Sequence, residues 1–160
     1  MLVGVDPILT GRLLCALDEM GHGDMVIVAD AHFTAAKLAR KPVIELPGLP
    51  SPRVLKAIRR LFVPDEFSDF QLGLMESPAA DLLDVQQELI AAADLGDPTV
   101  SPLPLDAPDA QGYRVGLIER FAFYDFAAKA ELIIRTGETR PYGNALFFKG
   151  VTPASEWPQR

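Results

Sequence analysis

Apolar residues recur along the chain at two spacings, one typical of helices and one of buried strands. Four residues at helical spacing indicate a first helix: Leu13, Leu14, Leu17 and Met20. Thr10 is its candidate N-cap, and Gly21 supplies a left-handed stop. The segment 25–29 is a short continuous apolar run rich in β-branched residues, which predicts a strand buried on both faces.

The same spacings predict further helices and strands in alternation. We expect helices over 35–40, 51–61, 81–93 and 120–130, and strands over 43–46, 70–75, 131–135 and 145–149. Alternating strands and helices are typical of an α/β fold. The sequence therefore predicts a three-layer α/β/α domain around a mixed, largely parallel sheet, in which the last strands are candidates for antiparallel pairing.

A single domain is expected over residues 1–151, followed by a loose C-terminal tail over 152–160. The chain has 160 residues, 49% of them hydrophobic, which is enough for one domain with its own core. The segment 94–111 is rich in Pro and Asp and has little periodicity. We interpret it as a long loop, for which a functional lid, an interface and disorder are three open alternatives.

The net charge of −7, from 15 basic and 22 acidic residues, narrows the classes of ligand. Lysine and arginine are scattered, so we expect no nucleic-acid partner. An acidic surface does not attract anionic substrates, so a neutral small molecule is easier to accommodate. No apolar stretch approaches the roughly 20 residues of a membrane span, and the segment 1–6 lacks the pattern of a signal peptide. We therefore expect no membrane partner and a cytoplasmic location.

Cysteine and histidine usage argues against a metal site. The only cysteine, Cys15, excludes a disulfide within one chain and a zinc cluster of cysteines, and its place on the first helix indicates a small core residue. The two histidines, His22 and His32, do not form a helical zinc pair. A phosphate loop and a Gly-x-Gly-x-x-Gly turn after the first strand are absent. We expect no metal and no organic cofactor.

Two candidate site residues flank the strand 25–29. His22 lies between two glycines before this strand, and histidine both gives and takes a proton near neutral pH. Asp30 follows the strand, at the edge where open α/β sheets usually bind ligands. The alternative is that both residues only cap turns. We interpret the nearby His32 as a partly buried, hydrogen-bonded histidine.

Two later segments also carry polar residues that a core would not select. Arg120 and Tyr124 lie beside aromatic residues at the start of the helix 120–130, and Tyr142, Gly143 and Asn144 form a turn that can present a phenol and an amide together. Each has a structural alternative. Arg120 can balance surface carboxylates, Tyr124 can be a core residue, and Gly and Asn are usual in hairpin turns.

In combination, these segments resemble the family of ribose pyranases and fucose mutarotases. The matching pieces, in the order of the family, are Met20-Gly21-His22-Gly23-Asp24, Ala29-Asp30-Ala31, Glu119-Arg120-Phe121-Ala122-Phe123-Tyr124, Thr136-Gly137-Glu138 and Tyr142-Gly143-Asn144. The resemblance runs to about Val151. It implies an isomerase that interconverts anomers of a free monosaccharide without a cofactor. It also implies a ring-shaped homo-oligomer, a decamer in the family.

The resemblance also assigns roles to residues. It implies that His22 is the proton donor and that Asp30, Arg120 and the turn 142–144 bind the substrate. Tyr124 or Tyr142 can face the apolar side of the sugar. Ribose pyranases have a histidine where this chain has Arg120, which favours the branch that acts on L-fucose. As a departure from the family, His32 and Thr34 stand where asparagine and proline are more usual.

The spacing of His22 and Asp30 bears on how the site is assembled. Eight residues separate them, and an extended chain covers roughly 3.3 Å per residue, so they can lie more than about 20 Å apart. Unless the chain folds back at Gly23, His22 of one subunit must meet Asp30 of its neighbour. We therefore hypothesise sites at subunit interfaces. A pyranase acting on a pentose such as ribose and a non-catalytic monosaccharide-binding subunit are the alternative functions.

Overall fold

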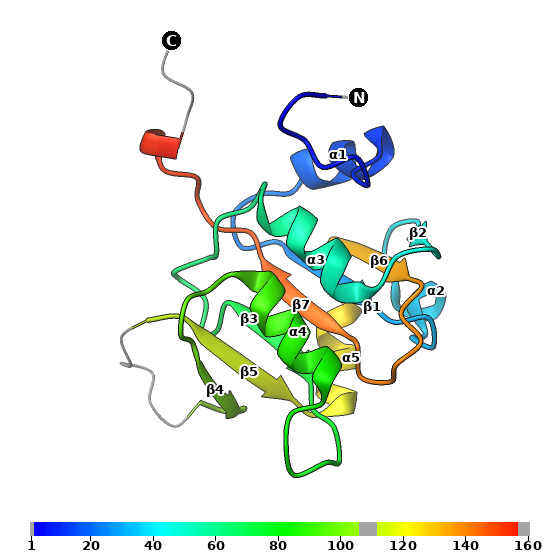
Figure 1. Ribbon diagram of the computed structural model, residues 1–160, viewed down its shortest axis with the longest axis vertical. Helices are drawn as coiled ribbons and strands as arrows, with labels where there is room; N and C mark the ends of the chain where they lie inside the picture. Colours follow the sequence, from blue (N-terminus) through cyan, green and yellow to red (C-terminus); the bar gives the residue numbers. More distant parts are fainter. Residues whose placement is uncertain (1, 106–111, 157–160) are drawn as a thin grey trace.

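One mixed sheet of seven strands organises the computed structural model, which describes residues 2–105 and 112–156 (Figure 1). The strand order is β2-β6-β1-β7-β3-β5-β4. The bounds are β1 Met25–Ala29, β2 Ile44–Leu46, β3 Leu72–Met75, β4 Thr99–Pro102, β5 Arg114–Ile118, β6 Leu132–Thr136 and β7 Ala145–Phe148. Strand β7 pairs antiparallel with β1 and β3, and the other neighbours pair in parallel. The predicted mixed, largely parallel sheet is confirmed, and of the last two strands only β7 is antiparallel.

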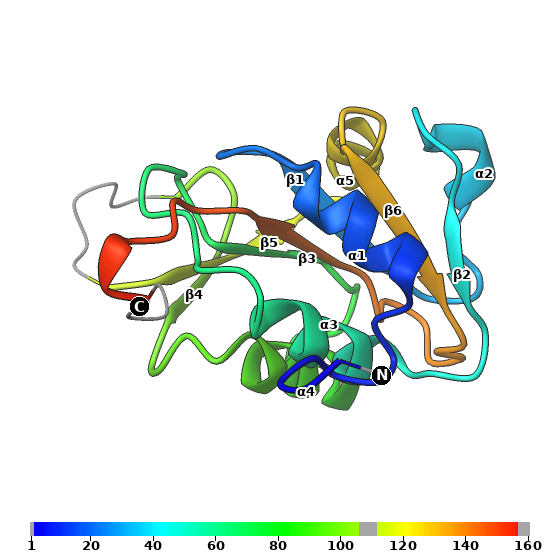
Figure 2. The same ribbon diagram turned by 90° about the horizontal axis from the view of Figure 1, so that it is seen from above.

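Helices cover both faces of the sheet and form the predicted three layers (Figure 2). One face carries α1 (Gly11–Asp18), α3 (Ser51–Arg59) and α4 (Asp84–Ala93), and the other carries α2 (Ala35–Leu38) and α5 (Arg120–Ala127). Successive residues of a strand point to opposite faces, so the central strands contribute to an apolar cluster on each side. The sheet is therefore buried on both faces, as its continuous apolar strands predict.

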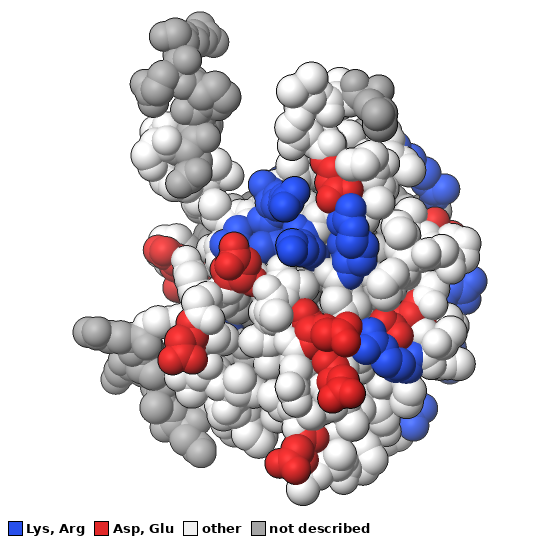
Figure 3. Space-filling view, viewed as in Figure 1, with Lys and Arg blue, Asp and Glu red and all other residues white. Residues whose placement is uncertain are grey.

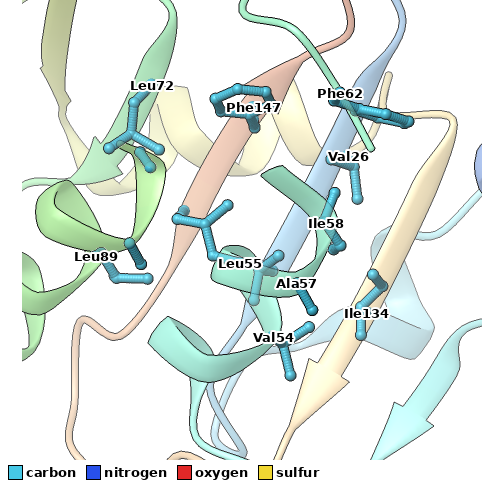
Figure 4. Close-up of a cluster of buried hydrophobic side chains, with 14 of the residues drawn as sticks. Val26, Val54, Leu55, Ala57, Ile58, Phe62, Leu72, Leu89, Ile134 and Phe147 are labelled. Atoms are coloured by element: carbon cyan, nitrogen blue, oxygen red, sulfur yellow. The ribbon is translucent and has the colours of Figure 1, made fainter. Parts of the chain in front are cut away.

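Helix α3 buries one side against the sheet. Val54, Leu55, Ala57 and Ile58 are fully buried and lie over β1, β6 and β7 (Figure 4). Burying one aliphatic side chain of the size of Leu or Ile contributes about 1.5–3 kcal/mol. These residues recur at helical spacing, so the sequence alone indicates this face.

Helix α1 begins where its sequence predicts but turns Cys15 outward. The hydroxyl of Thr10 accepts a hydrogen bond from the Leu13 N–H at 3.3 Å, which confirms the N-cap. Leu13 and Leu17 are buried, one helical turn apart. Cys15 lies two residues from each of them, on the opposite side of the helix, and is exposed. The prediction that Cys15 is a core residue is wrong.

Two strands were not predicted. Strand β4 lies within the segment 94–111, so the interpretation of that whole segment as a loop is wrong; residues 106–111 lie outside the described structure. Strand β5 has a glycine at its centre, Gly116, which weakens the apolar signal. Gly116 pairs with Gly73 of β3, and side chains at either position would press on the ring of Phe70. The close packing of β5 against β3 and Phe70 therefore explains this strand, and that packing is not visible in the local sequence pattern.

The described part of the C-terminal tail ends in one short 3₁₀ turn, Ala154–Glu156. Residues 157–160 lie outside the described structure, and the domain boundary at residue 151 stays a prediction. None of the described helices is both long and apolar enough to cross a membrane. Figure 3 shows basic side chains gathered over α3 with acidic side chains beside them over α4. Charges of both signs therefore share this face.

Candidate active site

Polar side chains gather at the edge of the sheet where the parallel strands end. Asp30 follows β1, Arg120 follows β5 and Glu138 lies two residues after β6. Strand β7 runs in the opposite direction, so Asn144, which precedes it, lies at the same edge. This is the edge at which open α/β sheets bind ligands.

Asp30 and Asn144 are buried at this edge and bind each other twice. Asn144 Nδ2 donates to Asp30 Oδ2 at 2.7 Å, and the Asp30 backbone N–H donates to Asn144 Oδ1 at 2.9 Å. The His32 N–H donates to Asp30 Oδ1 at 3.0 Å. Burial raises the pKa of Asp30, although these hydrogen bonds oppose the shift. Each carboxylate oxygen keeps a lone pair with which it can accept a ligand hydroxyl.

Arg120 and Tyr124 meet on the first turn of α5. Arg120 Nε donates to the Tyr124 hydroxyl at 2.9 Å, and the guanidinium carbon lies 5.5 Å from the centre of the tyrosine ring. The hydrogen bond to Tyr124, with Tyr142 close by, raises the pKa of Arg120. The ring of Tyr124 packs edge-on against Phe33, whose N–H donates to the Asp30 carbonyl. These contacts join α5 to the turn that carries Asp30.

The turn that carries Tyr142 and Gly143 has an unusual backbone. Tyr142 has φ 63°, in the left-handed region that a bulky residue rarely adopts. A Cβ on Gly143 would lie 2.7 Å from Glu138 Cγ, so a glycine is required for the close approach. The turn is therefore packed against Glu138 and is more than a connection between two strands. Backbone outliers of this kind are concentrated at functional sites.

His22 lies at the opposite edge of the sheet, paired with Asp65. Its Nε2 is 2.9 Å from Asp65 Oδ1; the imidazole is 46% exposed and the carboxylate 4%. Burial disfavours the charged carboxylate, but hydrogen bonds from Ser68, His22 and the Phe67 N–H keep the pKa of Asp65 below its usual value. The ionised Asp65 accepts the Nε2 hydrogen, which leaves Nδ1 of His22 as the nitrogen for proton exchange.

The turn that carries His22 is fixed from two sides. The Gly21 N–H donates to Asp24 Oδ2 at 2.7 Å, and the Gly23 N–H donates to the Lys149 carbonyl at 2.8 Å. Lys149 also extends its side chain to the end of α1, where Nζ donates to the carbonyls of Leu17 and Met20 at 3.0 and 2.6 Å. Strand β7 thus supports the His22 turn through Lys149.

The structure brings together all but one of the residues that the sequence predicts for the site. The turns and the helix start that carry them meet at the carboxyl edge: Asp30, Arg120, Tyr124, Tyr142, Gly143 and Asn144. His22 does not join them, because the five residues of β1 span about 16 Å between the two edges. His32 is exposed rather than partly buried; its Nε2 lies 3.1 Å from the Thr139 carbonyl oxygen.

Asp65 is a candidate site residue that sequence reasoning missed. It lies 43 residues from His22 in the chain, within the acidic stretch 65–69 that carries two other carboxylates. No local spacing distinguishes it from these neighbours. Its burial and its pairing with His22 become visible only in three dimensions.

The two edges differ in the chemistry that they offer. The cluster around Asp30 combines hydrogen-bond acceptors, donors and aromatic rings, which suits a neutral ligand rich in hydroxyl groups. The His22–Asp65 pair suits proton transfer. No group of three or more side chains that could hold a metal ion occurs in the ranges 2–105 and 112–156. The absence of a metal from the site stays a prediction.

Comparison with known proteins identifies the family. The model of the RbsD / FucU transport protein family matches residues 3–152. An L-fucose mutarotase of Glaesserella parasuis serovar 5 is 39% identical over 155 residues, which cover 96% of this chain and 97% of that protein. The chain belongs to the RbsD / FucU family, and the resemblance seen in its motifs is confirmed.

Solved structures agree with this assignment. FucU from Bifidobacterium longum superposes with a TM-score of 0.77 at 29% identity, over 94% of this chain and 99% of that chain. The fucose mutarotase from Streptococcus pneumoniae, in complex with L-fucose, superposes with a TM-score of 0.74 at 27% identity, over 95% and 100% of the two chains. The three-layer fold is therefore the fold of these proteins.

Proposed function

We propose that the chain is a mutarotase that interconverts the α and β anomers of free L-fucose. The observation that carries the proposal is the His22–Asp65 pair, an exposed imidazole held by a buried carboxylate, in a chain 39% identical to an L-fucose mutarotase. An imidazole oriented by a carboxylate can act as a general acid or base. The free thiol of Cys15 suits a reducing compartment, so we keep the cytoplasm as the proposed location.

The reaction moves protons and breaks and re-forms one bond. His22 Nδ1 delivers a proton to the ring oxygen while the anomeric hydroxyl loses one, and the bond between the anomeric carbon and the ring oxygen breaks. The aldehyde rotates, and the reverse steps close the other anomer and return both protons. A positioned acid or base contributes roughly 10²- to 10⁴-fold. This chemistry needs no metal or organic cofactor.

The carboxyl edge supplies the groups that hold the sugar. Asp30 accepts hydrogen bonds from two sugar hydroxyls and Arg120 donates. Asn144 donates through the Nδ2 hydrogen that otherwise points to a weak acceptor, Met75 Sδ, at 4.0 Å. The rings of Tyr124 and Tyr142 face the apolar side of the sugar. Asp30, whose pKa is raised by burial, is a carboxylate of this edge that can accept the proton of the anomeric hydroxyl.

We further propose that each site is shared by two copies of the chain. His22 lies at the other end of β1 from Asp30, so the His22–Asp65 pair of one copy would complete the polar edge of its neighbour. Each half also carries an exposed aromatic ring, Phe67 beside His22 and Phe121 beside Tyr124. Both rings lie where the neighbouring copy would cover them if the two halves meet. A ring-shaped homo-oligomer, a decamer by family resemblance, provides such contacts.

Saturation transfer in NMR tests the activity. Exchange between the α and β anomeric protons of L-fucose should accelerate when the protein is added and return to the uncatalysed rate in His22→Ala. The matched control is Glu45→Gln, which breaks an exposed ion pair with Arg135 and should keep full activity. Acceleration only with D-ribose would favour the pyranase. Sugar binding without accelerated exchange for any sugar would favour a binding subunit.

Mixed oligomers test the shared site. His22→Ala and Asp30→Ala proteins, each inactive alone, should regain part of the activity when they are unfolded together and reassembled. The regained activity comes from interfaces that carry one intact half from each variant. If native mass spectrometry shows mixed oligomers and these stay inactive, both halves belong to one chain and the sharing is wrong.

A further inference from the structure

The turn between β6 and β7 stores strain at one of the residues assigned to sugar binding. Tyr142 has φ 63°, in a sparsely populated region that a non-glycine residue adopts only at a cost in free energy. This conformation persists only where the surrounding structure holds it. The same turn carries Asn144, which holds Asp30 through two hydrogen bonds. The groups that hold this turn therefore set the geometry of the polar edge.

The side chain of Glu138 is the nearest support. It is buried at 4% exposure, and its Oε1 accepts from the backbone N–H and the Nε of Arg140 at 3.0 and 2.9 Å. Its Oε2 accepts from Arg140 Nη2 at 2.8 Å. Its Cγ fills the space next to Gly143 that a Cβ would need. Glu138 thus packs against the turn at Gly143, and hydrogen bonds from Arg140 hold Glu138 in place.

Arg140 connects this support to α4 in another layer of the fold. Its Nη1 and Nη2 donate to the two carboxylate oxygens of Glu88 at 2.8 and 2.9 Å, in bidentate geometry. Paired hydrogen bonds of this kind restrict both distance and orientation. Hydrogen bonds from Arg140 keep the pKa values of Glu138 and Glu88 below their usual values. Three charged side chains therefore form one continuous clamp, which we define as Glu88, Glu138 and Arg140.

The main chain of Glu138 connects the clamp to the Asp30 turn. Its carbonyl oxygen accepts a hydrogen bond from the Ala31 N–H at 2.8 Å. Its N–H donates to the Thr136 hydroxyl at 3.2 Å, and that hydroxyl in turn donates to the Ala29 carbonyl. Movement of Glu138 would therefore displace both partners of the Asp30–Asn144 pair.

We propose that Glu138 and Arg140, anchored by Glu88, are positioning residues that hold Tyr142 and Asn144 in the geometry that binds the sugar. The proposal rests on the proposed function for the identity of the ligand. The clamp lies on the side of the turn packed against α4, so it acts through Tyr142 and Asn144 and touches no reacting atom. Sugar affinity then depends on these three residues as well as on the residues that contact the sugar.

The test compares Arg140→Met with a matched control, Arg135→Met. The two arginines are 40% and 39% exposed and each pairs with a surface glutamate, but Arg135 pairs with Glu45, away from the turn. Misplacement of binding groups by about 1 Å can lower reaction efficiency about 10²-fold, so we expect Arg140→Met to lose about 10- to 100-fold in kcat/KM for L-fucose. Most of the loss should appear as a higher KM. Arg135→Met should keep the wild-type KM.

A conservative variant separates positioning from charge. Arg140→Lys keeps the positive charge but not the bidentate geometry, so it should recover only part of the affinity. Glu88→Gln leaves the Glu138–Arg140 pair intact and releases only the anchor, so it should raise KM in the same direction by a smaller factor. It also serves as the test if Arg140→Met fails to fold.

Hydrogen exchange provides a readout that does not depend on activity. The Asp30 amide donates to the Asn144 side chain, so its protection should fall in Arg140→Met and stay unchanged in Arg135→Met. If the wild-type protein does not accelerate anomeric exchange, the proposed function fails and this amide alone decides on the clamp. A folded Arg140→Met with wild-type protection of Asp30 and wild-type KM would overturn the proposal. Equal losses in both arginine variants would also overturn it.

Discussion

The imidazole of His22 is hydrogen-bonded to the carboxylate of Asp65, 43 residues further along the chain. The histidine is half exposed and the carboxylate is buried, so one member of the pair faces the solvent while the other fixes its orientation. A proton donor held in this way keeps one tautomer in its neutral form. This relationship makes Asp65 the residue that orients His22 in the proposed reaction.

Asp65→Asn should lower the rate of anomeric exchange by about 10²-fold, because a positioned acid or base contributes roughly 10²- to 10⁴-fold. The amide keeps the size of the side chain but no longer stabilises the protonated imidazole. NMR saturation transfer measures the rate, and Asp69→Asn, on the exposed side of the same loop, is the control. Wild-type exchange in a folded Asp65→Asn protein would show that His22 works without its partner.

The stability of the protein should depend on pH through Asp65. Its pKa in the folded state lies below the unfolded value of about 3.9, so the folded state binds fewer protons in this range. The stabilisation by Asp65 is therefore complete above about pH 5 and is lost as the pH falls through the folded pKa. Urea unfolding from pH 7 to pH 3 should show a smaller acid loss in Asp65→Asn than in the wild type. Parallel curves for the two proteins would contradict the prediction.

Replacing glycines near the site by alanine should lower the free energy of unfolding by amounts that follow the space available to a Cβ. A Cβ on Gly137 would lie 1.9 Å from the Pro47 carbonyl oxygen, and backbone cannot move aside as a side chain can. A Cβ on Gly143 would lie 2.7 Å from Cγ of the buried Glu138 side chain, and one on Gly48 would meet no atom within 4 Å. Overpacking typically costs about 1–3 kcal/mol, so Gly137→Ala should exceed this range, Gly143→Ala should fall within it and Gly48→Ala should be nearly neutral. The midpoints of urea unfolding for the three variants measure this ranking.

Lys149→Met should slow anomeric exchange with little change in sugar affinity. The variant removes the hydrogen bonds from Nζ to the carbonyls of Leu17 and Met20, just ahead of the His22 turn, and leaves the binding edge intact. A hydrogen bond that involves a charged group contributes about 1.5–3 kcal/mol, so the unfolding free energy should also fall by at least this much. Lys41→Met, at an exposed lysine paired with Glu131, is the control. A raised KM with unchanged kcat would contradict the assignment of Lys149 to the His22 turn.

Local pattern was sufficient for much of the fold. The capped start of α1, the inner face of α3 and the buried strand β1 each depend on residues within a few positions of one another. The motifs at His22, Asp30 and Tyr142 were likewise visible, because each occupies a contiguous stretch. The sequence therefore determined the class of fold, the family and most of the candidate site.

Only the tertiary structure decided how these pieces meet. The Asp30–Asn144 pair spans 114 residues of chain, and the partner of His22 depends on which loop lies beside the start of β1. The exposure of Cys15 and the pairing of β4 and β5 also depend on which surfaces the sheet order brings together. Periodicity reports neighbours within one or two turns, whereas hydrogen bonds and burial depend on distance in space. For this reason the pairing of His22 with Asp65 and the clamp around Arg140 required the folded chain.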